Sequence, residues 1–243
     1  MSRKKKLLLG GSGILLVLTA ACLIYLTTGS YPANEDAVTA LASAETYTVT
    51  EYDDGTTAFV PLEPKAGLIF YPGGKVEAEA YASLMAAFAR EDILCILLDL
   101  PFDLAVFDVT AADGIQEQYP EIQRWYLSGH SLGGAMAASY ASKHADKYDG
   151  LFLLAAYSTE DLTDSALKIV SLYGSEDLVL NREKYGEYRG NLPKDTLEQV
   201  IEGGSHAYFG SYGFQDGDGT PTISNQEQIE TTVQLCLSVM EQE

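Results

Sequence analysis

A serine lies at the centre of a glycine-rich pentapeptide, Gly129-His130-Ser131-Leu132-Gly133. The preceding residues, WYLS, predict a short strand, and the small residues that follow predict a helix. At such a strand-to-helix turn a serine hydroxyl projects out of the sheet, and backbone N–H groups at the helix start can meet a developing negative charge. The pattern predicts that Ser131 is the nucleophile of an acyl-transfer reaction.

A serine hydroxyl needs a general base, and the chain has three histidines. His130 adjoins the serine, and the turn directs its side chain elsewhere. His144 lies near the end of the predicted helix among charged residues and is typical of a surface position. His206 lies in the loop Gly203-Gly204-Ser205-His206, directly after the last predicted strand. We therefore expect His206 to be the base.

The base needs an acceptor that holds its tautomer and stabilises the imidazolium. Asp177 ends the turn Gly174-Ser175-Glu176-Asp177, which follows a predicted strand. We expect Asp177 to be this acid, with Glu176 as the neighbouring alternative. Asp161 and Asp164 are weaker candidates, because neither follows the end of a strand so directly.

An oxyanion hole for this serine should combine the N–H of Leu132 with one from the loop Pro72-Gly73-Gly74-Lys75. Gly74 is our first choice for the second donor, and Lys75 is the other. The Lys75 side chain is either solvated or available to an acidic substrate group. The expected substrate contacts are Lys75, His130, Tyr208 and Phe209.

Residues 208–223 should cover one wall of the site. The stretch Asp216-Gly217-Asp218-Gly219 within it is similar to a calcium loop, but it lacks the ligand spacing and the closing glutamate. A tight polar turn is the preferred interpretation. No CxxC motif or Cys/His cluster indicates zinc, and we expect neither a metal nor another cofactor.

Strands alternate with helices along the chain, which predicts an α/β fold with a mostly parallel sheet covered on both faces. Residues 46–52 and 56–61 flank Asp53-Asp54-Gly55 and predict an opening hairpin. The other expected strands are 66–71, 93–100, 125–128, 151–155, 169–173 and 196–201. The expected helices are 77–90, 103–118, 132–144 and 225–240.

The N-terminus has a basic flank at residues 1–6 and an uncharged, largely apolar run at 7–28, long enough to span a bilayer. This order predicts a single-pass anchor in the cell membrane, with the catalytic domain outside the cytoplasm. Cleavage or lipidation near Thr19-Ala20-Ala21-Cys22 is the alternative, although Thr19 stands where a lipoprotein box usually has leucine. Residues 29–44 are expected to be a linker, and residues 45–243 the domain.

The composition is acidic, with 15 Lys and Arg against 35 Asp and Glu. Four of those basic residues lie at positions 3–6, so the predicted domain is more acidic than the whole chain. Such a domain is repelled by phosphate backbones and by anionic lipids, which argues against nucleic-acid binding. Cys95 and Cys236 lie in apolar patterns, and we expect no structural disulfide.

The motifs YPGGK, GHSLGG, YGSED and GGSHAYFG occur in this order. The sequence from Ala66 onward resembles the α/β-hydrolase superfamily, and is similar to its compact, lidless, dienelactone-hydrolase-like branch, including membrane-anchored bacterial members. The resemblance implies the α/β-hydrolase fold and acyl-transfer hydrolysis through an acyl-enzyme. Dienelactone hydrolases have cysteine where this chain has Ser131, so their substrate is not carried over.

The expected function is hydrolysis of carboxylic esters by Ser131, His206 and Asp177. Only residues 156–166 separate two predicted strands where a lid would be inserted, so we expect an open site suited to small or extended soluble esters. A thioesterase, amidase or acyltransferase would use the same residues. A non-catalytic, membrane-tethered binding protein on the same fold is the alternative from another class.

Overall fold

The computed structural model describes residues 26–241. The chain divides into two compact units, Met1–Ser30 and Tyr31–Glu243, and the fold described below is that of the second unit. The predicted basic flank and most of the predicted 7–28 anchor lie outside the described residues. Within residues 26–241, every helix is too short or too polar to cross a membrane.

One eight-stranded sheet organises this unit, in the order β1-β2-β4-β3-β5-β6-β7-β8. The first two strands form the predicted antiparallel hairpin, and β2 pairs antiparallel with β4. All pairings from β4 to β8 are parallel. The strands are β1 Tyr47–Glu51, β2 Thr57–Pro61, β3 Ala66–Tyr71, β4 Ile93–Leu97, β5 Trp125–His130, β6 Gly150–Leu154, β7 Lys168–Gly174 and β8 Leu197–Ile201. The prediction of an α/β-hydrolase fold with a mostly parallel sheet is confirmed.

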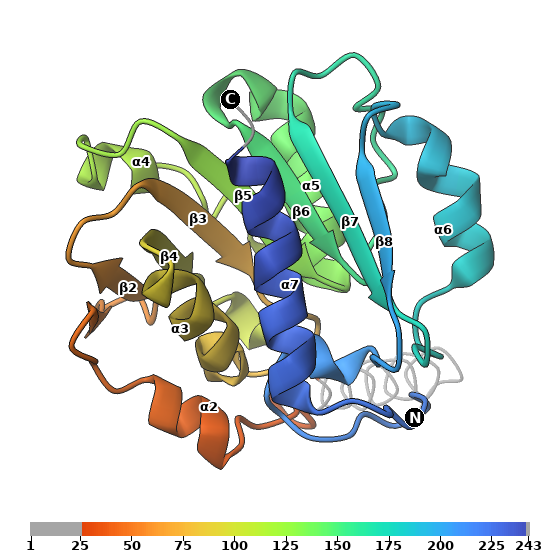
Figure 1. Ribbon diagram of the computed structural model, residues 1–243, viewed down its shortest axis with the longest axis horizontal. Coiled ribbons are helices and arrows are strands. Elements are labelled where there is room, and N and C mark those ends of the chain that lie inside the picture. The colour runs from red at the N-terminus through yellow and green to blue at the C-terminus, as the bar shows by residue number, and fades with distance from the viewer. Residues whose placement is uncertain (1–25, 242–243) are drawn as a thin grey trace, which may run out of the picture. The chain divides into compact units, whose positions relative to one another are not determined.

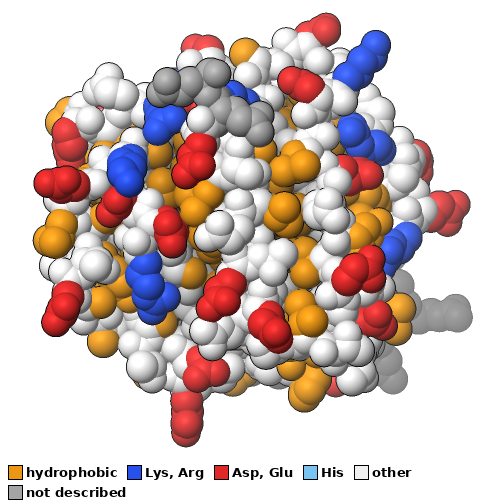
Figure 2. Space-filling model, viewed as in Figure 1, with side chains coloured by type: hydrophobic (Ala, Val, Ile, Leu, Met, Phe, Trp, Pro, Cys, Tyr) orange, Lys and Arg blue, Asp and Glu red, His pale blue; other side chains and the backbone are white. Residues whose placement is uncertain are grey.

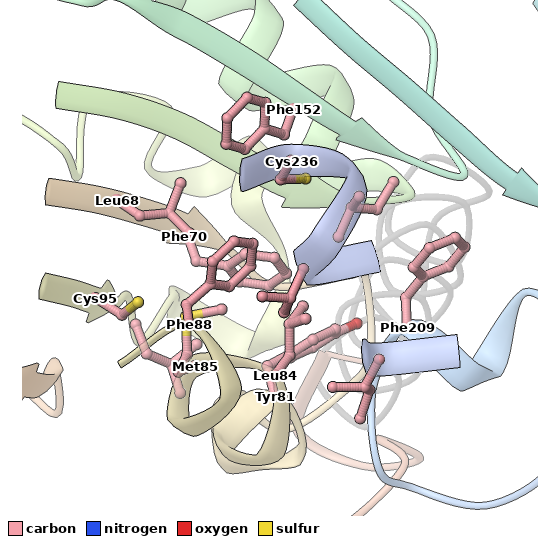
Figure 3. Close-up of a cluster of buried hydrophobic side chains, with 14 of the residues drawn as sticks. Leu68, Phe70, Tyr81, Leu84, Met85, Phe88, Cys95, Phe152, Phe209 and Cys236 are labelled. Atoms are coloured by element: carbon pink, nitrogen blue, oxygen red, sulfur yellow. The ribbon is translucent and has the colours of Figure 1, made fainter. Parts of the chain in front are cut away.

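Both faces of the sheet are covered, which explains why its central strands are continuously apolar. Side chains alternate between the faces: Leu68 and Phe70 of β3 enter one buried cluster, and Ile69 and Tyr71 enter the other. Helices α3 and α7 lie in front of the sheet in Figure 1, and α5 lies behind it. Figure 3 shows the front cluster, where α3 contributes Phe88.

The helices lie where the sequence predicted three of them. Helices α5 and α7 have the predicted bounds, and the predicted helix 77–90 begins as the 3₁₀ turn η1 before it becomes α3. The helices are α2 Glu35–Ala40, α3 Ala82–Arg90, α4 Ile115–Gln118, α5 Leu132–His144, α6 Arg182–Tyr188 and α7 Asn225–Met240. Shorter 3₁₀ turns are η1 Ala78–Tyr81, η2 Pro101–Asp103, η3 Ala105–Phe107, η4 Ala145–Lys147, η5 Arg189–Asn191 and η6 Ala207–Phe209.

The predicted helix at 103–118 is wrong. The segment forms η2, η3 and the single turn α4 instead. Phe102 and Asp103 have φ angles of 61° and 55°, and Gly114 has a φ of 78° immediately before α4. Left-handed residues at these positions interrupt a right-handed helix. Two helices, α2 and α6, were not predicted.

Helix α2 lies within residues 29–44, the stretch expected to be a linker. Its N-cap Asn34 accepts from the N–H of Ala37, and Ala37 itself is buried. The helix packs against α3 and η1, so the compact unit begins at Tyr31 and not after residue 44. Cys95 and Cys236 are buried free thiols.

Candidate active site

Ser131 occupies the turn between β5 and α5, at the carboxyl end of a central strand. Its φ and ψ are 51° and −121°, a conformation that few non-glycine residues adopt. A Cβ at Gly129 would lie 2.6 Å from the carbonyl carbon of Gly133, and a Cβ at Gly133 would overlap the Tyr71 and Pro72 carbonyl oxygens. Only glycine permits this close approach, so the G-x-S-x-G pattern has a steric cause.

Residues with strained backbone are concentrated in the loops at the carboxyl edge of the parallel strands. Of the six non-glycine residues with positive φ in the described chain, five lie in loops that follow β3, β4, β5 and β6: Lys75, Phe102, Asp103, Ser131 and Ala155. Strained backbone persists where surrounding structure holds it, commonly at functional sites. The carboxyl edge of the parallel strands is therefore the candidate site.

The structure brings His206 and Asp177 together. His206 Nδ1 lies 2.9 Å from Asp177 Oδ2, and both side chains are almost fully buried. The other Asp177 carboxylate oxygen accepts from the N–H groups of Val179 and Leu180, at 2.9 and 2.8 Å. These bonds leave Oδ2 directed at the imidazole and set its orientation. The alternative acid Glu176 accepts instead from the Ser175 hydroxyl.

His206 contacts the residue that precedes Ser131. Its ring packs at a tilt of 51° against that of His130, the residue before Ser131, with centroids 4.5 Å apart. Among the described residues, the Ser131 hydroxyl has no hydrogen-bond partner. The hydrogen bond between a nucleophile and its base is often long or poorly aligned until substrate binds. His144 lies at the far end of α5 against Tyr140, away from this edge.

The expected oxyanion donors also converge. A Cβ at Gly74 would lie 2.9 Å from Leu132 Cδ2, so the loop after β3 touches the residue that begins α5. The N–H of Lys75 donates to the Asp103 carbonyl at 2.7 Å. It is therefore not available to an oxyanion, and Gly74 remains as the candidate donor from this loop. Lys75 Nζ lies 3.5 Å from the Phe102 carbonyl oxygen, in the same group of loops.

Two of the expected substrate contacts are corrected. His130 and Phe209 have exposed fractions of 1% and 0%, so neither has surface to offer a substrate. Both side chains are instead buried against each other within the protein, with ring centroids 5.6 Å apart. Phe209 and Tyr81 lie in the front core cluster in Figure 3. Tyr208 remains partly exposed at the edge.

Sequence reasoning missed a buried bridge beneath the site. The Tyr81 hydroxyl accepts from the Gly73 N–H at 3.1 Å and lies 2.7 Å from His130 Nδ1. The Tyr81 hydroxyl therefore contacts the backbone of the loop after β3 and the imidazole of His130 at the same time. Burial, and then the nearby His206, hold the pKa of His130 well below its usual value. The neutral imidazole of His130 thus lies between Tyr81, which binds the loop after β3, and His206.

Two further polar residues hold the base loop. Gln228 of α7 is fully buried; its side chain accepts from the Ser205 N–H at 2.9 Å and donates to the Ser205 carbonyl at 2.8 Å. Asp218 accepts from the N–H of Ala207 with one oxygen, and from the N–H of Leu178 with the other. The Asp216-Gly219 stretch is thus a polar turn that joins the acid and base loops.

No three His, Cys, Asp or Glu side chains within residues 26–241 are grouped as a metal site. The chemistry available at this edge is that of a strained serine, a buried imidazole–carboxylate pair and two backbone N–H groups. This set can transfer a proton from a hydroxyl and stabilise an oxyanion.

Comparisons with known proteins agree with this architecture. Residues 67–230 match the alpha/beta hydrolase family. No curated protein matches the sequence. The chain is similar in structure to Est1E from Butyrivibrio proteoclasticus, with a TM-score of 0.59 and 13% identity over 82% of this chain and 100% of that one.

Two other solved structures are similar. The protein from Thermoplasma acidophilum described as a predicted CIB-like hydrolase has a TM-score of 0.56 and 16% identity, over 79% of this chain and 99% of that one. TT1662 from Thermus thermophilus has a TM-score of 0.58 and 14% identity, over 81% and 99%. At these identities the likeness concerns the fold. The family match covers more than half of the sequence, and the chain belongs to the alpha/beta hydrolase family.

Proposed function

We propose that this protein is a serine hydrolase that cleaves carboxylic esters through Ser131, His206 and Asp177. Membership of the alpha/beta hydrolase family supports a hydrolase. The observation that carries the proposal is the buried 2.9 Å contact between His206 Nδ1 and Asp177 Oδ2, against the residue that precedes a strained serine. A structural turn with no chemistry needs neither the strain nor the buried ionisable pair.

In the proposed mechanism, the Ser131 hydroxyl attacks the ester carbonyl while His206 Nε2 takes its proton. Asp177 holds the imidazole in the tautomer with the proton on Nδ1 and stabilises the imidazolium. The tetrahedral oxyanion is held by the N–H groups of Leu132 and Gly74. Leu132 is the first residue of a long helix, whose positive N-terminal end favours this charge.

Collapse of the tetrahedral intermediate breaks the bond to the alcohol oxygen, which leaves with the proton from His206. The acyl group stays on Ser131. Water then attacks this acyl-enzyme, again with His206 as base, and releases the carboxylic acid and the free serine. Attack by an amine, a thiol or a second alcohol would convert the same intermediate into the products of an acyltransferase.

The test is labelling of the full chain with a fluorophosphonate probe, together with hydrolysis of p-nitrophenyl acetate. Ser131→Ala should abolish labelling, and His206→Ala should lower kcat by about 10³-fold or more, because the triad acts as a unit. His144→Ala is the matched control and should keep wild-type labelling and turnover. Labelling that persists in folded Ser131→Ala contradicts the assignment, and a folded wild type that is never labelled favours the binding-protein alternative.

A further inference from the structure

The chain enters the domain beside the candidate active site. The Tyr31 N–H donates to the Lys75 carbonyl at 2.8 Å, and the Glu77 N–H donates to the Tyr31 carbonyl at 3.1 Å. Tyr31 thereby forms a parallel bridge with Val76, just after Gly74 of the proposed oxyanion loop. The first residue of the compact unit is fixed at the carboxyl edge of the sheet.

A second loop of the site also holds Tyr31. Its hydroxyl accepts from the Asp216 N–H at 3.1 Å, and its ring lies 5.6 Å from that of Tyr212. Both partners belong to the segment that follows His206 along the chain. Tyr31 is thus bound to loops on two sides of the site, and its place relative to the nucleophile is set by the fold.

The predicted anchor ends very close to this entry point. Only Gly29 and Ser30 separate Thr28, the last residue of the uncharged run, from Tyr31. Even a fully extended chain spans at most about 11 Å over these three peptide steps. In a chain anchored by residues 7–28, Tyr31 and the loop that it binds at Lys75 therefore follow the end of the anchor by no more than this length of chain.

The carboxyl edge of the sheet also carries exposed apolar side chains. Leu178 follows the acid and is 72% exposed, and Phe107 of the loop after β4 is 52% exposed. With Phe102, Val106 and Phe214 they form what we call the apolar rim, on loops that follow β4, β7 and β8. Val38, Tyr52 and Leu62 are the other large exposed apolar residues in the described chain, and none lies on these loops. Exposed apolar groups gathered on one side of a soluble domain mark a contact surface.

We propose that the apolar rim contacts the bilayer and that the substrates are esters with apolar chains drawn from the membrane. The inference rests on the proposed hydrolase function and on anchoring by residues 7–28. The connection between β6 and β7, where a lid would be inserted, is short and has neither helix nor strand. A membrane surface supplies the apolar cover that a lid would otherwise provide, and this revises the expectation of small soluble esters.

The acidic charge of the domain determines which lipid surfaces it can approach. Acidic side chains are spread over the face shown in Figure 2, and basic ones are fewer. An anionic lipid surface would repel this domain, so attachment depends on the anchor and on apolar contact. Phosphatidylcholine, which has no net charge, is therefore the membrane for the test.

The test uses the full chain in phosphatidylcholine vesicles with two substrates: water-soluble p-nitrophenyl acetate, and a fluorogenic long-chain diacylglycerol in the vesicles. The double variant Val106→Ser/Phe107→Ser should lower hydrolysis of the diacylglycerol about tenfold, because the apolar contact is lost. Hydrolysis of p-nitrophenyl acetate should stay within about twofold of wild type. Leu62→Ser is the matched control, since Leu62 is 74% exposed before β3, at the opposite edge, and should change neither rate.

A second variant tests the tether. Insertion of about twenty Gly and Ser residues between Gly29 and Ser30 should lower diacylglycerol hydrolysis and leave the soluble ester unaffected, because a long flexible linker frees the orientation of the domain. If both variants hydrolyse diacylglycerol like wild type, the membrane-facing arrangement is wrong while the hydrolase assignment stands. If wild type hydrolyses neither ester and Ser131 is not labelled, the proposed function fails and this inference fails with it.

Discussion

At the scale of single residues, the bridge from Gly73 through Tyr81 to His130 links two halves of the proposed machinery. Tyr81 is fully buried, and burial raises the pKa of its hydroxyl far above the usual range, so it stays protonated as a donor. His130 Nε2 has no hydrogen-bond partner in the described chain. A buried nitrogen without a hydrogen-bond partner lowers the stability of the fold, and such groups are often found in functional regions.

Tyr81→Phe should show that this bridge positions the oxyanion loop. The variant leaves the Gly73 N–H and His130 Nδ1 without a partner, so we expect about 1–3 kcal/mol less stability. It should also lower kcat about tenfold on p-nitrophenyl acetate with little change in KM, because Gly74 acts on the transition state. Urea unfolding and steady-state kinetics measure both effects.

Tyr126→Phe is the control for this change. Tyr126 is equally buried, stacks on Phe152, and its hydroxyl has no hydrogen-bond partner in the described chain. It should keep wild-type kcat. Equal losses of kcat in the two variants would mean that Tyr81 contributes only general packing.

At the scale of elements, the site depends on two loops, after β7 and after β8, that are held by groups from elsewhere in the fold. Helix α7 begins with a capping box between Ser224 and Glu227 and then places buried Gln228 against Ser205. The turn at Asp218 joins the loops after β7 and β8. Gln228 and Asp218 bond to the backbone of residues next to His206 and Asp177, and so help to position both side chains.

Asp218→Asn tests this loop-to-loop connection. An amide has only one acceptor oxygen, so the N–H of either Ala207 or Leu178 loses its partner. We expect a severalfold to about tenfold fall in kcat with a small fall in melting temperature, because misplacement of the base affects turnover more than folding. Asp216→Asn, two residues away and exposed, should behave like wild type. A lower melting temperature with unchanged kcat would show that Asp218 only stabilises the fold.

At the scale of the whole molecule, buried His130 makes folding depend on pH. The pKa of His130 is lowered in the folded state. As the pH falls, the unfolded chain therefore binds a proton at this histidine before the folded chain does. Above the ordinary histidine pKa of about 6.5, His130 is neutral in both the folded and the unfolded chain and does not change the free energy of unfolding. Below it, the free energy of unfolding should fall by up to roughly 1.4 kcal/mol for each pH unit.

Urea unfolding at pH 8, 6 and 5 measures this dependence. His130→Asn, although less stable at pH 8, should lose less stability between pH 7 and 5 than wild type, because the titrating group is gone. His144→Gln, a change at a partly exposed position of α5, controls for the loss of a histidine as such. Parallel pH profiles for wild type and His130→Asn would contradict a neutral buried His130.

Much of the fold was predictable because its signals are local. Continuous apolar runs marked the parallel strands, and α5 and α7 followed their helical patterns. The segment 103–118 could not be predicted this way, because left-handed residues at 102 and 103 are held by contacts such as that between Lys75 N–H and the Asp103 carbonyl. A helical pattern gives no sign of such distant contacts.

The sequence by itself determined the candidate nucleophile, base and acid, since each follows a recognisable strand and the glycines beside Ser131 are required by steric contact. Only the tertiary structure decided what supports them. Tyr81 meets His130 across 49 positions, and Gln228 meets Ser205 across 23. It also placed Tyr31 against the Lys75 loop. These contacts depend on how separate elements pack, and no local pattern encodes that packing.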